Sequence, residues 1–146
     1  KKKSVFLFSK EDQYRPEVLA YQNTIQKFKT RKKIMVLTKN TITKPAYLTA
    51  EYSILKERFN DSESIQFCYY NPFLGIIPLE LSDLYPASHY EMPRLNFRPE
   101  DFPTFAHTWK VFFTNNKFDV VHTPKNDDFL KYFVKLLPKN IKKKFL

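Results

Sequence analysis

The sequence contains one glycine, Gly75, among its 146 residues. Loops that cradle phosphates, such as the P-loop and the dinucleotide fingerprint, need several glycines because their backbone approaches the ligand closely. The sequence therefore excludes both motifs. Four prolines surround the glycine: Pro72, Pro78, Pro86 and Pro93. They predict a stiff segment, either a rigid connection or a binding loop, in which the glycine meets a need for positive φ or for the absence of a Cβ atom.

Cysteine is equally scarce, with Cys68 as the one example. No intramolecular disulfide can form, which favours a reducing, intracellular setting. Cys68 lies in the apolar run Ile65–Tyr70, where a cysteine is typically an inert buried side chain and not a nucleophile. No group of His, Cys, Asp and Glu residues has the spacing of a zinc site. We therefore predict neither a metal nor a cofactor.

Long apolar runs are absent as well. No run approaches the roughly 18 residues of a membrane span, and the apolar stretch after Lys1–Lys3 is too short for a signal peptide. We expect a cytoplasmic protein without a membrane partner. The length suits one core, so we predict a single domain over 1–146, with 1–14 as an N-terminal arm or edge strand and 139–146 as a basic C-terminal tail.

Positive charge is abundant, with a net charge of +10. The charge is concentrated in three segments: Lys1–Lys3, Lys27–Lys33 and Lys139–Lys144. If these segments converge in the fold they form a phosphate-binding surface for nucleic acid; the alternative is solvated lysines that favour helix C-termini without any partner. The residues predicted to contact nucleic acid are Lys29, Arg31, Lys32, Lys33, Lys142, Lys143 and Lys144.

Helical periodicity alternates along the chain with short, continuous apolar runs. Helices are predicted over 15–28, 47–59, 78–84, 100–115 and 126–137. Strands are predicted over 34–37, 65–70 and 118–122, and a further one at 5–8. Apolar runs of this kind are typical of strands buried on both faces. The alternation predicts an α/β domain whose mostly parallel sheet is covered by helices on both sides.

In such sheets, ligands bind beyond the carboxyl ends of the strands. Here those ends lead into 38–47, 71–78 and 123–126. The first two segments are rich in polar groups and proline. Loop chemistry and topology therefore predict a binding site at this end of the sheet.

Two segments resemble a known family: Pro72–Leu81 (PFLGIIPLEL) and Leu84–Pro93 (LYPASHYEMP). They look like the domain shared by archaeosine synthase and related archaeal tRNA-guanine transglycosylase-like proteins. A weaker likeness extends from Arg15 to the last predicted helix. The resemblance implies a uracil-DNA glycosylase-like fold, a three-layer α/β/α sandwich with a short, mostly parallel central sheet. This implication agrees with the order of elements predicted above.

The chain departs from this family in the first motif, P-C-S-x-x-K-P-Y-x-x-S-x-S-H. The matching segment Lys39–Tyr52 keeps Lys44 and Pro45 unchanged, whereas Asn40 replaces the cysteine and Glu51–Tyr52 replaces the closing Ser-His. These changes remove a thiol and an imidazole, which are acid, base and nucleophile groups. In the family, the reaction transfers lysine onto a 7-cyano-7-deazaguanine base in tRNA, so the resemblance implies a site with a degenerate catalytic motif.

Lys44 is the candidate catalytic residue. It precedes a proline, which favours an extended conformation, and a partly desolvated lysine there acts on a base or holds a phosphate; a plain surface lysine is the alternative. The residues predicted to bind the substrate are Asn40, Thr41, Pro45, Tyr47, Asn71, Pro72, Gly75 and His89. His89 has the alternative role of anchoring its own loop.

Three functional hypotheses follow. The first is a tRNA- or nucleoside-binding accessory module in tRNA modification, with tRNA and a protein of a modification complex as partners. The second is an active tRNA-modifying transferase that uses Lys44. The third is a structural, protein-binding subunit in which bulky side chains close the pocket. Whether the chain is an enzyme is left open by the sequence.

Overall fold

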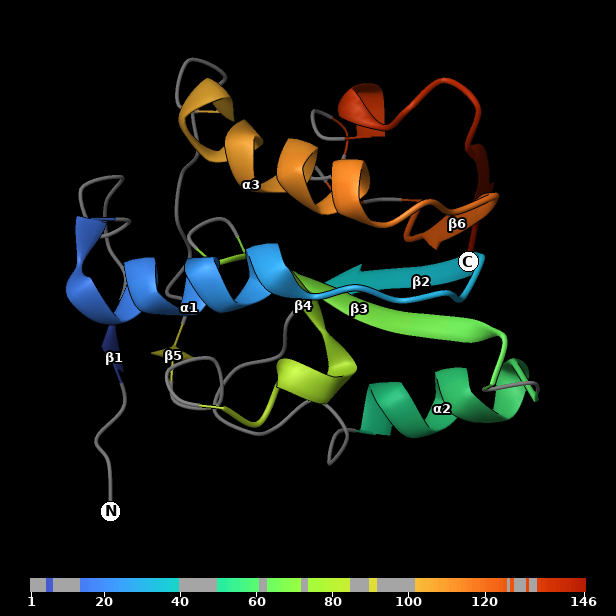
Figure 1. Ribbon diagram of the computed structural model, residues 1–146. Helices are drawn as coiled ribbons and strands as arrows, with labels where there is room; N and C mark the ends of the chain where they lie inside the picture. Colours follow the sequence, from blue (N-terminus) through green and yellow to red (C-terminus); the bar gives the residue numbers. More distant parts are fainter. Residues whose placement is uncertain are drawn as a thin grey trace.

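The strands of the computed structural model form a five-stranded, mostly parallel sheet (Figure 1). The structure describes residues 5–6, 14–39, 50–60, 63–71, 74–84, 90–91, 102–125, 127, 131 and 134–146. At 5–6, 39, 51, 71, 90–91 and 102–105 it describes the backbone alone.

The sheet has the strand order β4-β3-β2-β6-β7. In that order the strands are β4 (Gly75–Pro78), β3 (Ile65–Asn71), β2 (Ile34–Lys39), β6 (Val120–Thr123) and β7 (Lys142–Phe145). All neighbours are parallel except β3 and β4. Ile34 pairs with both Ile65 and Val120, so β2, β3 and β6 begin level with one another. The predicted α/β class and mostly parallel sheet are confirmed.

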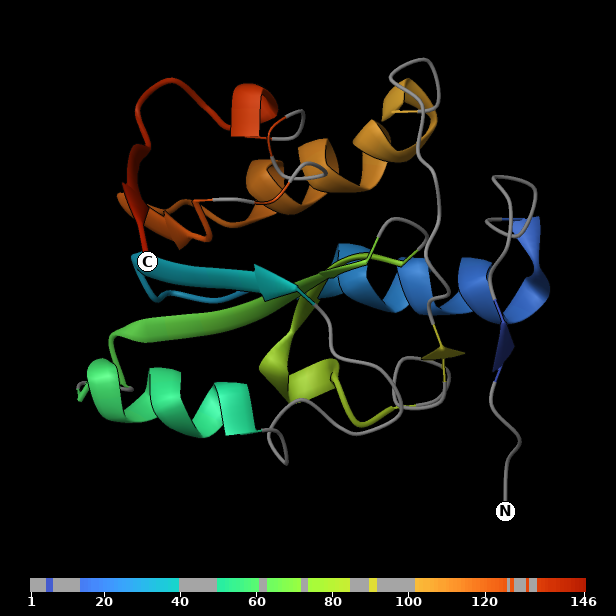
Figure 2. The same ribbon diagram turned by 180° about the vertical axis from the view of Figure 1, so that it is seen from behind.

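Helices cover both faces of this sheet (Figures 1 and 2). The described helices are α1 (Pro16–Lys27), α2 (Ala50–Arg58) and α3 (Phe102–Asn115). Successive residues of a strand face opposite sides. Met35 and Leu37 pack in one cluster with α1 and α3, whereas Val36 packs in a second cluster with residues of α2. The arrangement is consistent with an α/β sandwich, and the likeness to uracil-DNA glycosylases stays a prediction.

Aromatic side chains fill much of the core on the α1 and α3 side. Trp109 and Phe112 of α3 are almost completely buried. The ring of Phe112 stacks on Phe28 and on Phe118, with 6.3 Å between centroids in each pair. The aromatic side chains of this region therefore serve packing.

The first predicted strand does not extend the main sheet. β1 (Val5–Phe6) pairs in parallel with β5 (Tyr90–Glu91) in a separate two-stranded sheet. The segment was expected as an edge strand or a packed arm. Its pairing with 90–91 was not predicted, because that partner lies far along the chain and leaves no local signal.

The segment around the lone glycine is largely a strand. We expected a loop followed by a helix over 78–84, but Gly75–Pro78 forms β4, and the helical part shrinks to the 3-10 helix η3 (Leu79–Leu81). Ile76 and Ile77 are completely buried. Their burial favours a strand in the sheet over the loop that the surrounding prolines had predicted. Pro78 is tolerated because β4 is an edge strand, where a residue without a backbone N–H does not interrupt the hydrogen bonds of the sheet.

The C-terminal segment is also a strand. Residues 142–145, predicted as a basic tail, form β7 beside β6. In the described part of the range predicted as a helix over 126–137, Lys131 is helical and Val134–Leu136 form the 3-10 helix η6. All four residues of β7 are exposed, so no apolar pattern identified the strand.

Gly75 meets both needs predicted for it. Its φ is 91°, in the region that favours glycine. A Cβ atom there would lie 2.8 Å from Thr108 Oγ1 and 2.9 Å from Thr108 Cβ. The glycine thus lets β4 approach α3 closely.

Candidate functional site

Most of the site predicted at the carboxyl ends lies outside the described residues. This holds for Asn40, Thr41, Lys44, Pro45, Tyr47, Pro72 and His89. Asn71 ends β3, with its backbone alone described, and Gly75 begins β4 opposite it. The catalytic role of Lys44 and the substrate roles of the others therefore stay predictions.

One polar pair is described at this end of the sheet. The Tyr70 hydroxyl donates a hydrogen bond to the Asp127 carboxylate, which joins the end of β3 to the segment after β6. Burial, followed by the hydrogen bond and charge of Asp127, raises the pKa of Tyr70. The phenol therefore stays protonated as a donor. The sequence did not predict this pairing, because the two residues lie 57 positions apart along the chain.

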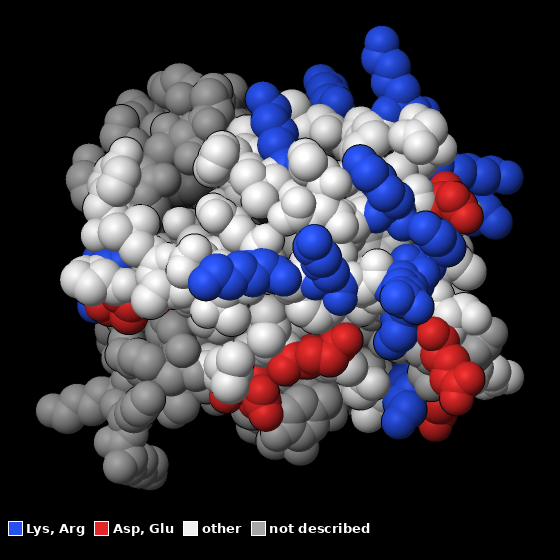
Figure 3. Space-filling view, in the orientation of Figure 1, with Lys and Arg blue, Asp and Glu red and all other residues white. Residues whose placement is uncertain are grey.

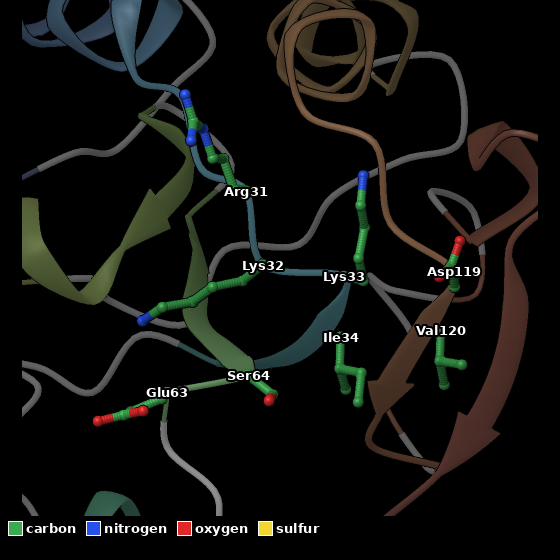
Figure 4. Close-up of a pocket in the computed structure, with 8 residues that line it drawn as sticks. All are labelled: Arg31, Lys32, Lys33, Ile34, Glu63, Ser64, Asp119 and Val120. Carbon is green, nitrogen blue, oxygen red and sulfur yellow. The ribbon is translucent and has the colours of Figure 1, made fainter.

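An open depression of about 560 Å³ lies at the opposite end of the sheet, where the strands begin (Figure 4). Its lining residues come from the segments entering β2, β3 and β6: Arg31, Lys32, Lys33, Ile34, Glu63, Ser64, Asp119 and Val120. Three of the predicted nucleic-acid contacts thus share one hollow. The depression was not predicted, because the rule for α/β sheets directs attention to the carboxyl ends.

Asn116 fixes the backbone that leads into this depression. Its side chain is buried, and its Oδ1 accepts a hydrogen bond from the Thr30 N–H at 2.8 Å. Its Nδ2 donates to the carbonyl oxygens of Phe28 and Phe112, at 3.1 Å each. One amide therefore ties the end of α3 to the chain on both sides of Lys29.

We expect Asn116→Ala to lower the free energy of unfolding by about 1–3 kcal/mol, because the partly buried Thr30 N–H and Phe28 carbonyl lose their bonds to the Asn116 side chain. Asn115→Ala is the matched control: Asn115 is exposed and makes one bond, from Nδ2 to the Gln26 carbonyl at 2.7 Å. Its loss should cost less than about 1 kcal/mol. Urea denaturation of the two variants measures the difference, and equal losses would contradict this role for Asn116.

The backbone of Asp119 connects the two basic segments. Its N–H donates to the Lys33 carbonyl at 2.7 Å, and its carbonyl accepts from the Lys142 N–H at 2.9 Å. Because neighbouring strands lie about 4.8 Å apart, β7 begins about 10 Å from β2. Two lysine-rich segments that are distant in sequence therefore lie on either side of the start of β6.

We call Arg31, Lys32, Lys33, Lys142 and Lys144 the basic surface. Figure 3 shows Lys and Arg side chains gathered on this side of the molecule. Side chains alternate along a strand, so Lys142 and Lys144 face the side of the sheet that α2 covers, whereas Lys143 faces the side that α1 and α3 cover. Lys33 points away from Ile34 and Val120, toward the same side as Lys143 (Figure 4). Among the described residues, the ion pair is Arg15–Glu17, and no member of the basic surface takes part in one.

The depression also contains two carboxylates, on Glu63 and Asp119. In Figure 4 the side chains of Lys32 and Glu63 extend to the same side, whereas Lys33 points away from both. The carboxylates reduce the positive potential inside the hollow. The excess positive charge therefore lies with Lys33 on one face of the sheet and with Lys142 and Lys144 on the other.

Other candidates for chemistry are less favourable. Cys68 is buried, and burial raises the pKa of its thiol well above the ordinary value; the interpretation of an inert core residue is confirmed. Within the described ranges, no three His, Cys, Asp or Glu side chains are grouped as metal ligands. None of the helices that the structure describes combines the length and apolar content needed to cross a membrane.

Comparison with known proteins gives one informative similarity. Over 93 residues the chain is 32% identical to the tRNA-guanine(15) transglycosylase of Saccharolobus solfataricus. The aligned part is 62% of this chain and 18% of that protein, so the chain spans less than a fifth of its relative. No family model matches the chain, and no solved structure matches it. The similarity supports a distant relationship to tRNA-guanine transglycosylases.

Proposed function

We propose that this chain is a tRNA- or nucleoside-binding accessory module in tRNA modification, which binds phosphates of tRNA through the basic surface. The link made by Asp119 between Lys33 and Lys142 carries the proposal, because it holds two basic segments together at one end of the sheet. The similarity to a protein named for its action on tRNA supports the choice of nucleic acid. The module acts in the cytoplasm with a partner protein that supplies catalysis.

The basic surface suits a polyanion for two reasons. Lysines and arginines that neutralise phosphates release counterions, which is the main source of affinity for nucleic acids. The backbone of Thr30 and Lys33 is already held by Asn116 and Asp119. A surface fixed before binding loses little conformational entropy on binding.

The proposal predicts a steep salt dependence of tRNA binding. If the five side chains of the basic surface each contact a phosphate, log K should fall with log salt with a slope of about −4. Fluorescence anisotropy with a labelled tRNA over a series of salt concentrations measures this slope. Absence of affinity at low salt, or affinity that does not change with salt, would contradict the proposed function.

A further inference from the structure

His122 of β6 lies beside Lys144 of the basic surface, on the face of the sheet that α2 covers. Its imidazole is half-buried and contacts the ring of Phe59, with 4.9 Å between centroids and 62° between planes. On its other side, in β2, it pairs with the apolar Val36. Phe59 and Val36 thus hold the ring between a helix end and the sheet.

Two cationic side chains lie beside this imidazole, and a third lies on the same face of the sheet. Lys144 pairs directly with His122 on the neighbouring strand, and paired residues of adjacent strands share a face. Lys142 precedes it by two residues and faces the same way. The Arg58 guanidinium, at the end of α2, lies 5.9 Å from the centre of the Phe59 ring. The end of α2 and the strand β7 therefore both bring positive charge close to His122.

We propose that Arg58, His122, Lys142 and Lys144 form a binding site, the histidine site, for one phosphate group of a polynucleotide. This inference rests on the proposed function and extends the basic surface along the α2 face. The guanidinium supplies a planar pair of donors, the lysines supply mobile donors, and a protonated imidazole supplies a further N–H. Neither Arg58 nor His122 was a predicted contact.

The histidine couples this site to pH. Burial, then the charges of Lys144 and Arg58, lower the pKa of His122 in the free protein. These are the charged groups acting on it among the described residues, and both are cationic. A bound phosphate offsets their charge and favours the imidazolium, so the pKa is higher in the complex. Between the two pKa values, binding takes up a proton and tightens as the pH falls.

Titration of the His122 imidazole by NMR tests the site without RNA. Sodium sulfate is the probe, because its charge is constant across the titration range, and sodium chloride at equal ionic strength is the control. We expect sulfate, and not chloride, to raise the pKa of His122. Lys144→Gln should abolish this response, whereas Lys143→Gln, on the same strand but the opposite face, should retain it. No response to sulfate, or equal loss in both variants, would overturn the proposal.

The second test of the histidine site compares the affinity for tRNA at two pH values. Affinity should be about three- to tenfold higher at about pH 5.5 than at about pH 7.5, and His122→Gln should remove this difference. Binding with a steep salt slope but the same pH dependence in both proteins would refute the histidine site and leave the proposed function intact. A sulfate response without any tRNA binding would support the site and refute the proposed function.

Discussion

Replacing Arg31 and Lys33 together by glutamate is expected to weaken tRNA binding about a hundredfold at low salt, because phosphate contacts dominate affinity. Each change removes an attraction and adds a repulsion. Both side chains are exposed, so the fold should tolerate the change. The neighbouring backbone is held by Asn116 and Asp119, so the new carboxylates cannot move far from the bound phosphates. Fluorescence anisotropy with labelled tRNA measures the loss.

Lys125→Glu with Lys135→Glu is the matched control. These residues are equally exposed, and their replacement changes the net charge by the same amount. Neither lines the depression. We expect this pair to weaken binding by less than about fivefold, as long-range charge effects are screened. Equal losses in the two double variants would show that net charge, and not the basic surface, determines binding.

Gly75→Ala is expected to lower the free energy of unfolding by about 2–5 kcal/mol. Positive φ costs a residue with a Cβ atom about 1–2 kcal/mol. The new methyl group would also lie under 3.0 Å from two atoms of Thr108, and such overpacking costs typically about 1–3 kcal/mol. Urea denaturation followed by circular dichroism measures the loss.

Gly75→Asn separates these two contributions. Asparagine tolerates positive φ better than alanine does, but it places a Cβ atom at the same position beside Thr108. If backbone conformation dominates, Gly75→Asn should be the more stable variant. If the clash dominates, the larger side chain should be at least as destabilising. A Gly75→Ala protein as stable as the original would contradict both explanations.

The fold class could be predicted because its signals are local. Val18, Tyr21 and Ile25 repeat at helical spacing, and all three are buried on α1. The run from Ile34 to Leu37 is apolar throughout and lies in the central strand of the sheet. Both patterns depend on neighbours within a few residues, and both predictions are confirmed.

The missed strand β7 shows where local signals end. Lys142, Lys143 and Lys144 carry the same charge and are all exposed, so nothing in their order distinguishes a strand from a tail. Pairing with β6 alone defines β7. That pairing joins residues about twenty positions apart, which the sequence pattern does not record. The same pairing brings Lys144 to His122.

Only part of the candidate site was predicted, because the rest of it also depends on contacts between residues that are distant in sequence. Arg31, Lys32 and Lys33 were chosen from their charge. The contribution of Asn116 was not predicted, since an asparagine after a helix has no distinctive pattern. Its role depends on Phe28 and Thr30, which lie far away along the chain. The position of the depression likewise follows from the way separate segments enter the sheet.

The length of β2 has a consequence for the geometry of any RNA complex. Ile34–Lys39 rises about 3.3 Å per residue, so its two ends are separated by about 17 Å. The basic surface adjoins the first end, and the chain continues from the second toward Lys44. An RNA that is bound at the basic surface and also reaches the carboxyl end of β2 would therefore have to span about 17 Å of the protein.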